Sequence, residues 1–336
     1  VGLLWGGGTM NIGNGDDISA RGLLLGWGLS GEGSTDKTFT INMTGGSLTV
    51  GPNSETDYQL VLSENSLGTG AVFNHSGGTL SPAKMTLNRN NASGGEYHLS
   101  GSGLLIPGNI TPTNAALGDF TLDGGILRAP ASNEDWISYS GDSTRRSRIT
   151  FQGAGGFIDT QGYDVGIRAW TDGDGSLTKT GSGKLTLTWR VYHTGVTSVN
   201  EGTLQLGEGD SQEAALGSGD FVLADHTHLI FDRNANMQDF TNQSISGAGD
   251  VTLRGMSTGY YRFLNYTGTL GHSGRTVVDL DPGGDWYQGT LWLEKDDVLS
   301  HVSVLELQAG KIYTRGQTGN GLTVAGIDGV AGTYIT

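Results

Sequence analysis

The segment "SLTKTGSGKLTLTWRVYHTGVTSVNEGTLQLG", residues 176–207, decides the fold class. It holds three short runs in which apolar and polar residues alternate, at 185–187, 196–199 and 203–206. This alternation predicts β-strands, because successive side chains of a strand point to opposite faces. Each run is bounded by glycine and is too short to be stable alone. We therefore expect these strands to be stabilised by pairing with similar segments elsewhere in the chain.

The composition extends this prediction to the whole chain. Its 336 residues include 59 glycines and 6 prolines, and apolar residues make up 35%. Many short strands joined by glycine-rich turns are typical of such a composition. The closest approach to an amphipathic helix is the segment 296–310, but its centre, 302–307, alternates with a period of two and predicts a strand.

A second pattern recurs in the first half: an apolar or aromatic strand, a small polar residue, glycines, and a second apolar strand. The first glycine of each copy stands at position 45, 77, 101 or 124, so the steps along the chain are 32, 24 and 23. A step of about 24 residues suits one turn of a β-solenoid with three short strands, since glycine makes sharp corners without backbone strain. The four copies are "FTINMTGGSLTV" (39–50), "AVFNHSGGTLSP" (71–82), "GEYHLSGSGLLIP" (95–107) and "GDFTLDGGILRAP" (118–130).

The fold prediction is therefore an all-β parallel β-helix with almost no α-helix. At about 24 residues per turn, the chain would make roughly 14 rungs. Each rung would stack its strands on the rungs before and after it, as nearest-neighbour repeats do.

The segment 176–207 resembles the autotransporter-associated β-strand repeat. The matching parts are the stretch 177–183, which begins Leu-Thr-Lys-Thr-Gly, the corner at 192–195 and the closing Gly-Thr-Leu strand at 202–206. The glycine-glycine copies resemble repeats found beside this motif, whereas Trp189, Arg190 and His193 depart from it. The resemblance implies a right-handed parallel β-helix that is exported by a bacterium to its surface or exterior. It also implies a role as a stalk, adhesin or surface layer, without catalytic residues.

For the domain organisation, we expect residues 1–336 to form a single continuous β-solenoid. Residues 1–148 would be its glycine-glycine half, and residues 149–336 the half related to the autotransporter-associated repeat. The stretches 1–12 and 321–336 are both strand-like and lack a polar cap, so we expect a fragment of a longer chain. Unpaired strand edges at such ends would let copies associate head to tail unless neighbouring domains cover them.

Charge and cysteine content narrow the function classes. The net charge is −15, from 34 acidic and 19 basic residues, so we expect no nucleic-acid partner. Cysteine is absent, which excludes disulfides, thiol catalysis and Cys-ligated zinc. The chain also has no apolar stretch long enough to insert into a membrane as a helix.

An enzyme is the competing function class, because polysaccharide lyases and glycoside hydrolases also use β-helices. Asp172 and Asp174 in "TDGDGS" are weak candidates for a Ca²⁺ site, since Asp and Gly in a tight turn also satisfy backbone groups. His226 and His228 share a strand face, but a third metal ligand is not visible. We therefore predict no catalytic residue and no cofactor. A polysaccharide-cleaving enzyme is the alternative.

Aromatic residues crowd the second half and give the best candidate contact surface. Aromatic side chains of adjacent rungs can align into a flat strip that stacks on sugar rings or on a partner protein. The other interpretation is that they fill the solenoid core. A polysaccharide is thus the expected alternative partner, and the candidate contact residues are Trp170, Trp189, Tyr260, Tyr261, Trp286, Tyr287 and Trp292.

Overall fold

The computed structural model describes most of the chain in segments. Its residues form two compact units, unit 1 (Val1–Leu177) and unit 2 (Thr178–Thr336). The boundary expected between residues 148 and 149 thus falls inside unit 1, and the single continuous solenoid stays a prediction. The described residues are 2–5, 8–27, 38–51, 59–63, 70–87, 95–111, 119–138, 148–209, 216–233, 238–240, 243–255, 260–263, 270–281, 288–293, 304–314, 326–329 and 334–335.

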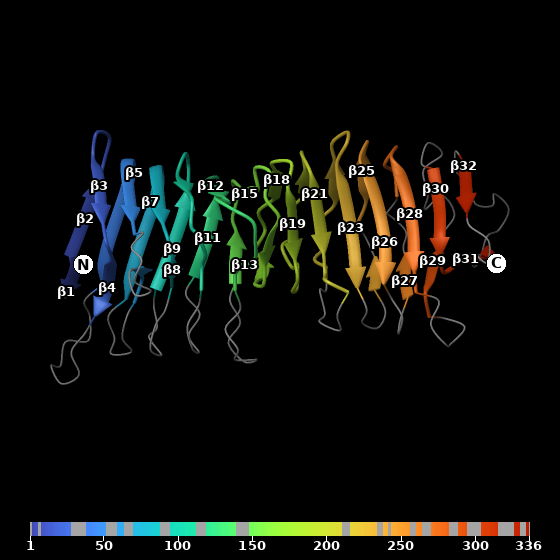
Figure 1. Ribbon diagram of the computed structural model, residues 1–336, viewed down its shortest axis with the longest axis horizontal. Helices are drawn as coiled ribbons and strands as arrows, with labels where there is room; N and C mark the ends of the chain where they lie inside the picture. The colour runs from blue at the N-terminus through green and yellow to red at the C-terminus, as the bar shows by residue number, and fades with distance from the viewer. Residues whose placement is uncertain are drawn as a thin grey trace. The chain divides into compact units, whose positions relative to one another are not determined.

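Unit 1 consists of three columns of parallel strands, in which each strand pairs with its counterparts in the preceding and following rungs (Figure 1). The first column holds β1 (Gly2–Trp5), β4 (Leu23–Trp27), β6 (Leu60–Val61), β8 (Met85–Thr86), a bridge at Ile110, β13 (Asn133–Ile137) and β16 (Val165–Ile167). The second holds β2 (Gly8–Ile12), the first parts of β5 (Phe39–Val50) and β7 (Ala71–Pro82), β9 (Gly95–Ser100), β11 (Asp119–Asp123), β14 (Arg148–Phe151) and β17 (Trp170–Asp172). The third holds β3 (Asp17–Ala20), the second parts of β5 and β7, β10 (Leu104–Leu105), β12 (Ile126–Arg128) and β15 (Gly156–Asp159).

Unit 2 repeats this plan with shorter strands. Its first column holds β19 (Lys184–Leu187), β21 (Thr203–Leu206), β23 (His228–Arg233), β26 (Asp250–Gly255), β28 (Arg275–Leu280), β30 (Val304–Ala309) and β32 (Gly326–Gly329). A second column holds β18 (Leu177–Thr180), β20 (Thr197–Val199), β22 (Phe221–Leu223) and β25 (Ile245–Gly247). A third holds β24 (Gln238–Phe240), β27 (Tyr260–Phe263), β29 (Thr290–Leu293), β31 (Lys311–Thr314) and β33 (Tyr334–Ile335).

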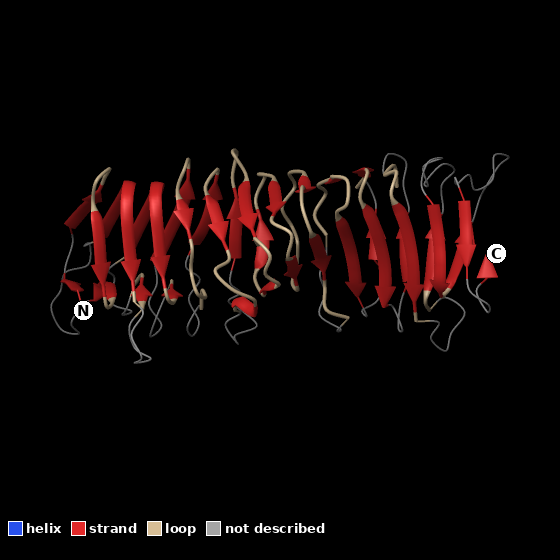
Figure 2. Ribbon diagram, turned by 45° about the horizontal axis from the view of Figure 1, so that its top comes forward, coloured by secondary structure: helices blue, strands red, loops and turns tan. Residues whose placement is uncertain are grey.

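The prediction of an all-β parallel β-helix is confirmed. The described residues contain strands, turns and bends but no helix (Figure 2). The first column has seven members in unit 1, counting the bridge at Ile110, and seven in unit 2. This agrees with the expected number of rungs, roughly 14.

Inward-facing apolar side chains form the core of each unit. In unit 2, Leu204, Leu229 and Val251 are successive register partners, and each is fully buried. In unit 1, the rings of Phe73, Tyr97 and Phe120 follow one another at centroid distances of 5.3 and 5.5 Å. Burying one such side chain contributes about 1.5–3 kcal/mol, so a short strand is stabilised through its stack rather than by its own length.

One corner of unit 1 is a stack of glycines. The strand register aligns Gly46 with Gly78, Gly103, Gly125 and Gly156. The first three steps along the chain are therefore 32, 25 and 22, rather than the predicted 32, 24 and 23. The difference arises because the turn at residues 100–103 holds one extra residue, which shifts the glycine that occupies the stacked position.

Candidate functional site

The predicted aromatic set is divided between surface, core and segments outside the described residues. Trp170 begins β17 and is partly buried, with the Arg148 guanidinium 5.7 Å from its ring centroid. Trp189 is also partly buried and follows β19. Trp286 and Tyr287 lie outside the described residues, as does the side chain of Tyr260.

Tyr261 lies in the core, which removes it from the predicted contact surface. Its side chain is fully buried, and its hydroxyl oxygen lies 3.0 Å from the backbone oxygens of Phe231 and Arg254, which share its single proton. Burial raises the pKa of this phenol well above its usual value, because the charged form would lose its hydration. Successive side chains of a strand point to opposite faces, so a run of aromatic residues in the sequence could not show which of them is buried.

Trp292 is a partly exposed member of the predicted set that forms an aromatic pair with a residue of a neighbouring rung. It lies on β29, and its ring centroid is 4.4 Å from that of Tyr313 on β31, with an interplanar angle of 45°. The two residues are direct register partners, and both are partly exposed. Tyr313 is not in the predicted set, although the alternation in "GKIYTRG" already places it on a strand face.

Within the part of the chain that the structure describes, the candidate Ca²⁺ ligands Asp172 and Asp174 are not grouped with a further carboxylate. One Asp172 oxygen accepts a hydrogen bond from Arg148 Nη1 at 2.9 Å, and the other accepts from the backbone N–H of Gly173 at 2.8 Å. Asp174 is exposed in the following bend. No group of three or more acidic or histidine side chains that could hold a metal ion occurs within the described segments.

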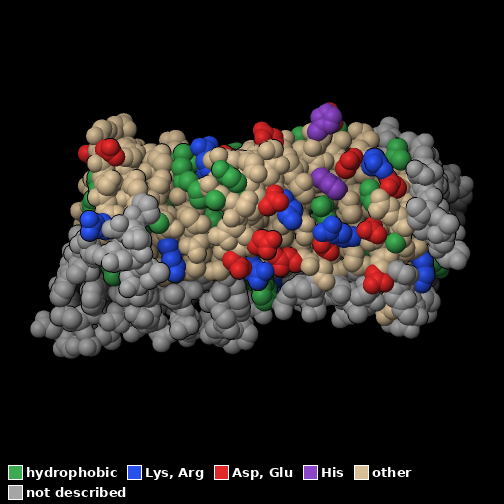
Figure 3. All heavy atoms as spheres, viewed as in Figure 1, with side chains coloured by type: hydrophobic (Ala, Val, Ile, Leu, Met, Phe, Trp, Pro, Cys, Tyr) green, Lys and Arg blue, Asp and Glu red, His purple; other side chains and the backbone are tan. Residues whose placement is uncertain are grey.

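The outward face of β21, β23 and β26 carries a polar network, which we call the polar face of unit 2. Asp232 pairs with Arg254 on the next rung, and both side chains contact Gln205. His228 and Thr252 are linked across the same two strands at 2.8 Å. Acidic, basic and histidine side chains mix over these strands in Figure 3. Opposite charges on successive rungs thus satisfy one another within the sheet.

Three buried histidines share a sequence pattern, His-(Ser/Thr)-Gly-x-Thr, that sequence reasoning missed. It occurs at residues 75–79, 193–197 and 272–276. Each imidazole lies at a corner and is almost fully buried. Burial lowers the pKa of each of the three to about 4, because a charged ring would be desolvated there. The three rings are therefore neutral at pH 7.

The hydrogen bonds of these imidazoles are structural. His75 Nε2 lies 3.1 Å from the carbonyl oxygen of Gly78, which can only accept, so this nitrogen carries the proton. Its Nδ1 therefore accepts from the Tyr97 hydroxyl at 2.6 Å. In the other two corners, His193 Nε2 is 2.7 Å from Thr197 Oγ1, and His272 Nε2 is 3.0 Å from Thr276 Oγ1.

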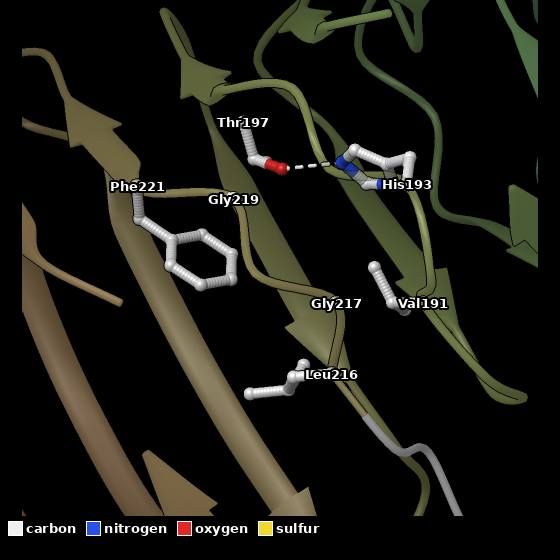
Figure 4. A pocket seen from close by; sticks show the side chains of 7 residues that line it. All are labelled: Val191, His193, Thr197, Leu216, Gly217, Gly219 and Phe221. Atoms are coloured by element: carbon white, nitrogen blue, oxygen red, sulfur yellow. Dashed lines mark hydrogen bonds between the residues drawn. The ribbon is translucent and has the colours of Figure 1, made fainter. Parts of the chain in front are cut away.

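A small cavity lies beside His193 (Figure 4). Its volume of about 10 Å³ has room for about one water molecule. It is therefore too small for a sugar or a metabolite. The side chains of Val191, Leu216 and Phe221 surround it, and the glycines 217 and 219 complete its wall.

Lys179 is the fully buried cation of the segment that resembles the autotransporter-associated repeat. Its ammonium group donates to the carbonyl oxygens of Thr180, Gly181 and Glu201. The Glu201 carboxylate in turn accepts from the backbone N–H of Gly181 at 3.2 Å. The lysine of the Leu-Thr-Lys-Thr-Gly stretch thus holds a glycine corner together by donating to three backbone carbonyl groups.

Comparisons with known proteins give no match among family models, curated proteins or solved structures. Within the described segments, no helix is long and apolar enough to cross a membrane. The arrangement offers a partly exposed aromatic pair, a polar face with internally paired charges, and buried polar groups that hold corners.

Proposed function

We propose that this chain is a non-catalytic structural protein of the bacterial cell surface or exterior, acting as a stalk, an adhesin or a filament subunit. One observation carries the proposal: buried imidazoles and a buried lysine of the described segments serve the scaffold, and a partly buried carboxylate is paired with an arginine. The imidazoles at 75, 193 and 272 hold corners, the ammonium of Lys179 binds carbonyl groups, and Asp232 is paired with Arg254. Head-to-tail association of copies, expected from the sequence, belongs to this proposal.

The test is incubation of the purified protein with a panel of acidic and neutral polysaccharides, with and without Ca²⁺. We expect no release of reducing ends and no unsaturated products. Reproducible cleavage that is abolished by Asp232→Asn or Asp172→Asn, in variants that remain folded, would contradict the proposal and support a β-helix lyase or glycosidase.

A second candidate function, binding of a polysaccharide without cleavage, is favoured by the Trp292–Tyr313 pair. Two partly exposed rings on successive strands present a surface on which the C–H faces of a sugar can stack. Their register fixes them about 4.8 Å apart along the rungs, so the platform is rigid.

If this function is correct, Trp292→Ala should weaken binding to the polysaccharide that is retained most strongly by roughly tenfold, since a central aromatic contact contributes more than about 1 kcal/mol. Tyr313→Phe should bind like the unmodified protein, because it keeps the ring. Affinity electrophoresis through gels containing each polysaccharide measures this effect. The matched control is Trp189→Ala, which removes a partly buried tryptophan from a different part of unit 2. Equal losses in both tryptophan variants would argue against a site at Trp292.

A further inference from the structure

The outward face of the third column of unit 1 changes from polar to apolar along the rungs. Its first positions are Asp17, Ser47 and Thr79, which are register partners on β3, β5 and β7. The same line of side chains continues through Leu104, Ile126 and Phe157 on β10, β12 and β15. All three of these apolar side chains are partly exposed, as is Ile106 beside them.

We call Leu104, Ile106, Ile126 and Phe157 the apolar strip of unit 1. Hydrophobic side chains gather over β12 and β15 on the face shown in Figure 3. Inward neighbours such as Leu105, Leu127 and Ile158 are completely buried, so the core does not need the strip for its own packing. Hydroxyl side chains occupy the equivalent places on β5 and β7, so the strand geometry does not require apolar residues there either.

A pair of opposite charges borders the strip. Arg128 follows Ile126 on β12, and its Nε donates to Asp159 Oδ2 on β15 at 2.8 Å. The side chains retain 33% and 17% exposure, so both reach the surface next to the strip. A guanidinium has five N–H donors and a carboxylate has several acceptor sites, so each group has capacity for a further partner.

We propose that the part of the apolar strip on β12 and β15, Ile126 and Phe157, binds the same part of a second copy, related by a twofold axis that runs parallel to the strands between β12 and β15. This pairing deepens the proposed structural role and rests on it. The axis would place Ile126 of one copy opposite Phe157 of the other. It would also place each Arg128 opposite the Asp159 of the second copy. Such an arrangement is self-complementary, as an isologous interface requires.

The chemistry of the strip favours a second copy over a sugar or a charged ligand. Three of its four side chains are aliphatic, whereas sugar stacking uses flat aromatic rings. The two bordering charges have opposite signs, so a ligand of one charge would repel one of them. A second copy presents the same rung spacing of about 4.8 Å and the same two charges in reverse order.

The strip is small, and this determines the strength of the pairing. Three rungs span about 10 Å between the outer strands, far less than the roughly 800 Å² per partner that stable interfaces cover. Both copies also carry a net charge of −15, which opposes association. The pairing is therefore weak, and it is best detected by trapping it.

The absence of cysteine makes trapping specific, because one introduced thiol is the sole reactive site in each variant. The two copies of residue 126 would lie one rung apart along the interface, about 5 Å, whereas the two copies of residue 79 would lie about 24 Å apart. We expect a short bismaleimide to cross-link Ile126→Cys into dimers at least fivefold faster than Thr79→Cys. Equal rates for these two sites would overturn the proposal.

A charge exchange tests the twofold relation independently. Arg128→Asp has two acidic groups at the border, and Asp159→Arg has two basic groups. Each variant alone should repel itself, whereas an equimolar mixture restores both intermolecular pairs. Sedimentation velocity of the two variants should thus show more dimer in the mixture than in either one alone, with matched circular dichroism spectra as the folding control. A mixture that sediments like its separate components would overturn the pairing, while the polysaccharide test of the structural role stands apart from this result.

Discussion

Lowering the pH from 7.0 to 4.5 should reduce the free energy of unfolding by several kcal/mol. The imidazoles at 75, 193 and 272 have pKa values lowered to about 4 in the folded protein. An unfolded histidine has a pKa of about 6.5, so the unfolded chain takes up protons in this interval while the folded chain does not. Stability is therefore full above pH 6.5 and is lost as the pH falls towards 4. Each imidazole contributes a loss of about 2–3 kcal/mol at pH 4.5.

The environments of the three imidazoles make the prediction specific. His75 contacts the Tyr97 hydroxyl and the backbone of Gly78, and neither of these groups carries a charge at this pH. The hydrogen-bond partners of His193 and His272 include the hydroxyls of Thr197 and Thr276. Asp250 acts on His272 from the neighbouring strand and partly offsets its desolvation.

Urea unfolding at a series of pH values, followed by circular dichroism, measures the effect. In His75→Gln, the loss of unfolding free energy between pH 7.0 and 4.5 should be smaller by the contribution of one imidazole, about 2–3 kcal/mol. Glutamine keeps a polar group but does not titrate. His226→Asn is the matched control, because His226 is exposed and asparagine tolerates its positive φ of 61°. A stability that is unchanged between pH 6.5 and 4.5 would contradict the buried neutral state of these rings.

Replacing Gly78 by alanine should strongly destabilise unit 1. Gly78 has a φ of +80°, and a Cβ there would lie 2.5 Å from the backbone of Gly45 and Gly46 on the preceding rung. The substitution would combine left-handed strain of about 1–2 kcal/mol with an overpacking cost of about 1–3 kcal/mol. We expect a total loss of about 2–5 kcal/mol in the free energy of unfolding.

Substitutions at two other glycines of unit 1 distinguish the backbone strain from the overpacking. Gly15 has a φ of +89° but no atom lies within 4 Å of the position that an added methyl group would take, so Gly15→Ala should show the backbone strain alone. Gly153 has neither a positive φ nor a close neighbour, and Gly153→Ala should leave stability within about 0.5 kcal/mol of its original value. Thermal and urea unfolding of the three variants should rank them in this order. A Gly78→Ala variant as stable as Gly15→Ala would show that the stacked corner can move apart.

The fold could be predicted from local patterns because the side-chain alternation and the corner glycines act at short range. The alternation in "TLQL" and the paired glycines at 45 and 46 correspond directly to a strand and to a corner in the structure. The shift from Gly101 to Gly103 in the stack could not be predicted. It depends on how many residues the turn of that rung holds, and only the pairing of strands on both sides reveals this number.

The candidate sites were less predictable, because they depend on which face of a strand points outward. Tyr261 and Trp292 are both aromatic and lie on strands of one column, yet the first is in the core and the second is partly exposed. The three His-(Ser/Thr)-Gly-x-Thr stretches can be found in the sequence, but their structural role depends on the burial of the imidazole ring, which the sequence does not show. The apolar strip depends on the register of β10, β12 and β15, which residue spacing alone does not fix.

The spacing between register partners has a consequence for how the chain folds. Leu185 pairs with Leu204, and Phe39 pairs with Ala71. The chain segment between Phe39 and Ala71 is therefore longer than the segment between Leu185 and Leu204, but less than twice as long. The entropy of closing a loop depends only logarithmically on its length, so these two closures differ by about 0.5 kcal/mol. Each new rung therefore forms at nearly the same cost once its predecessor is in place. Such a chain can fold progressively from whichever rung forms first, with each completed rung serving as the template for the next.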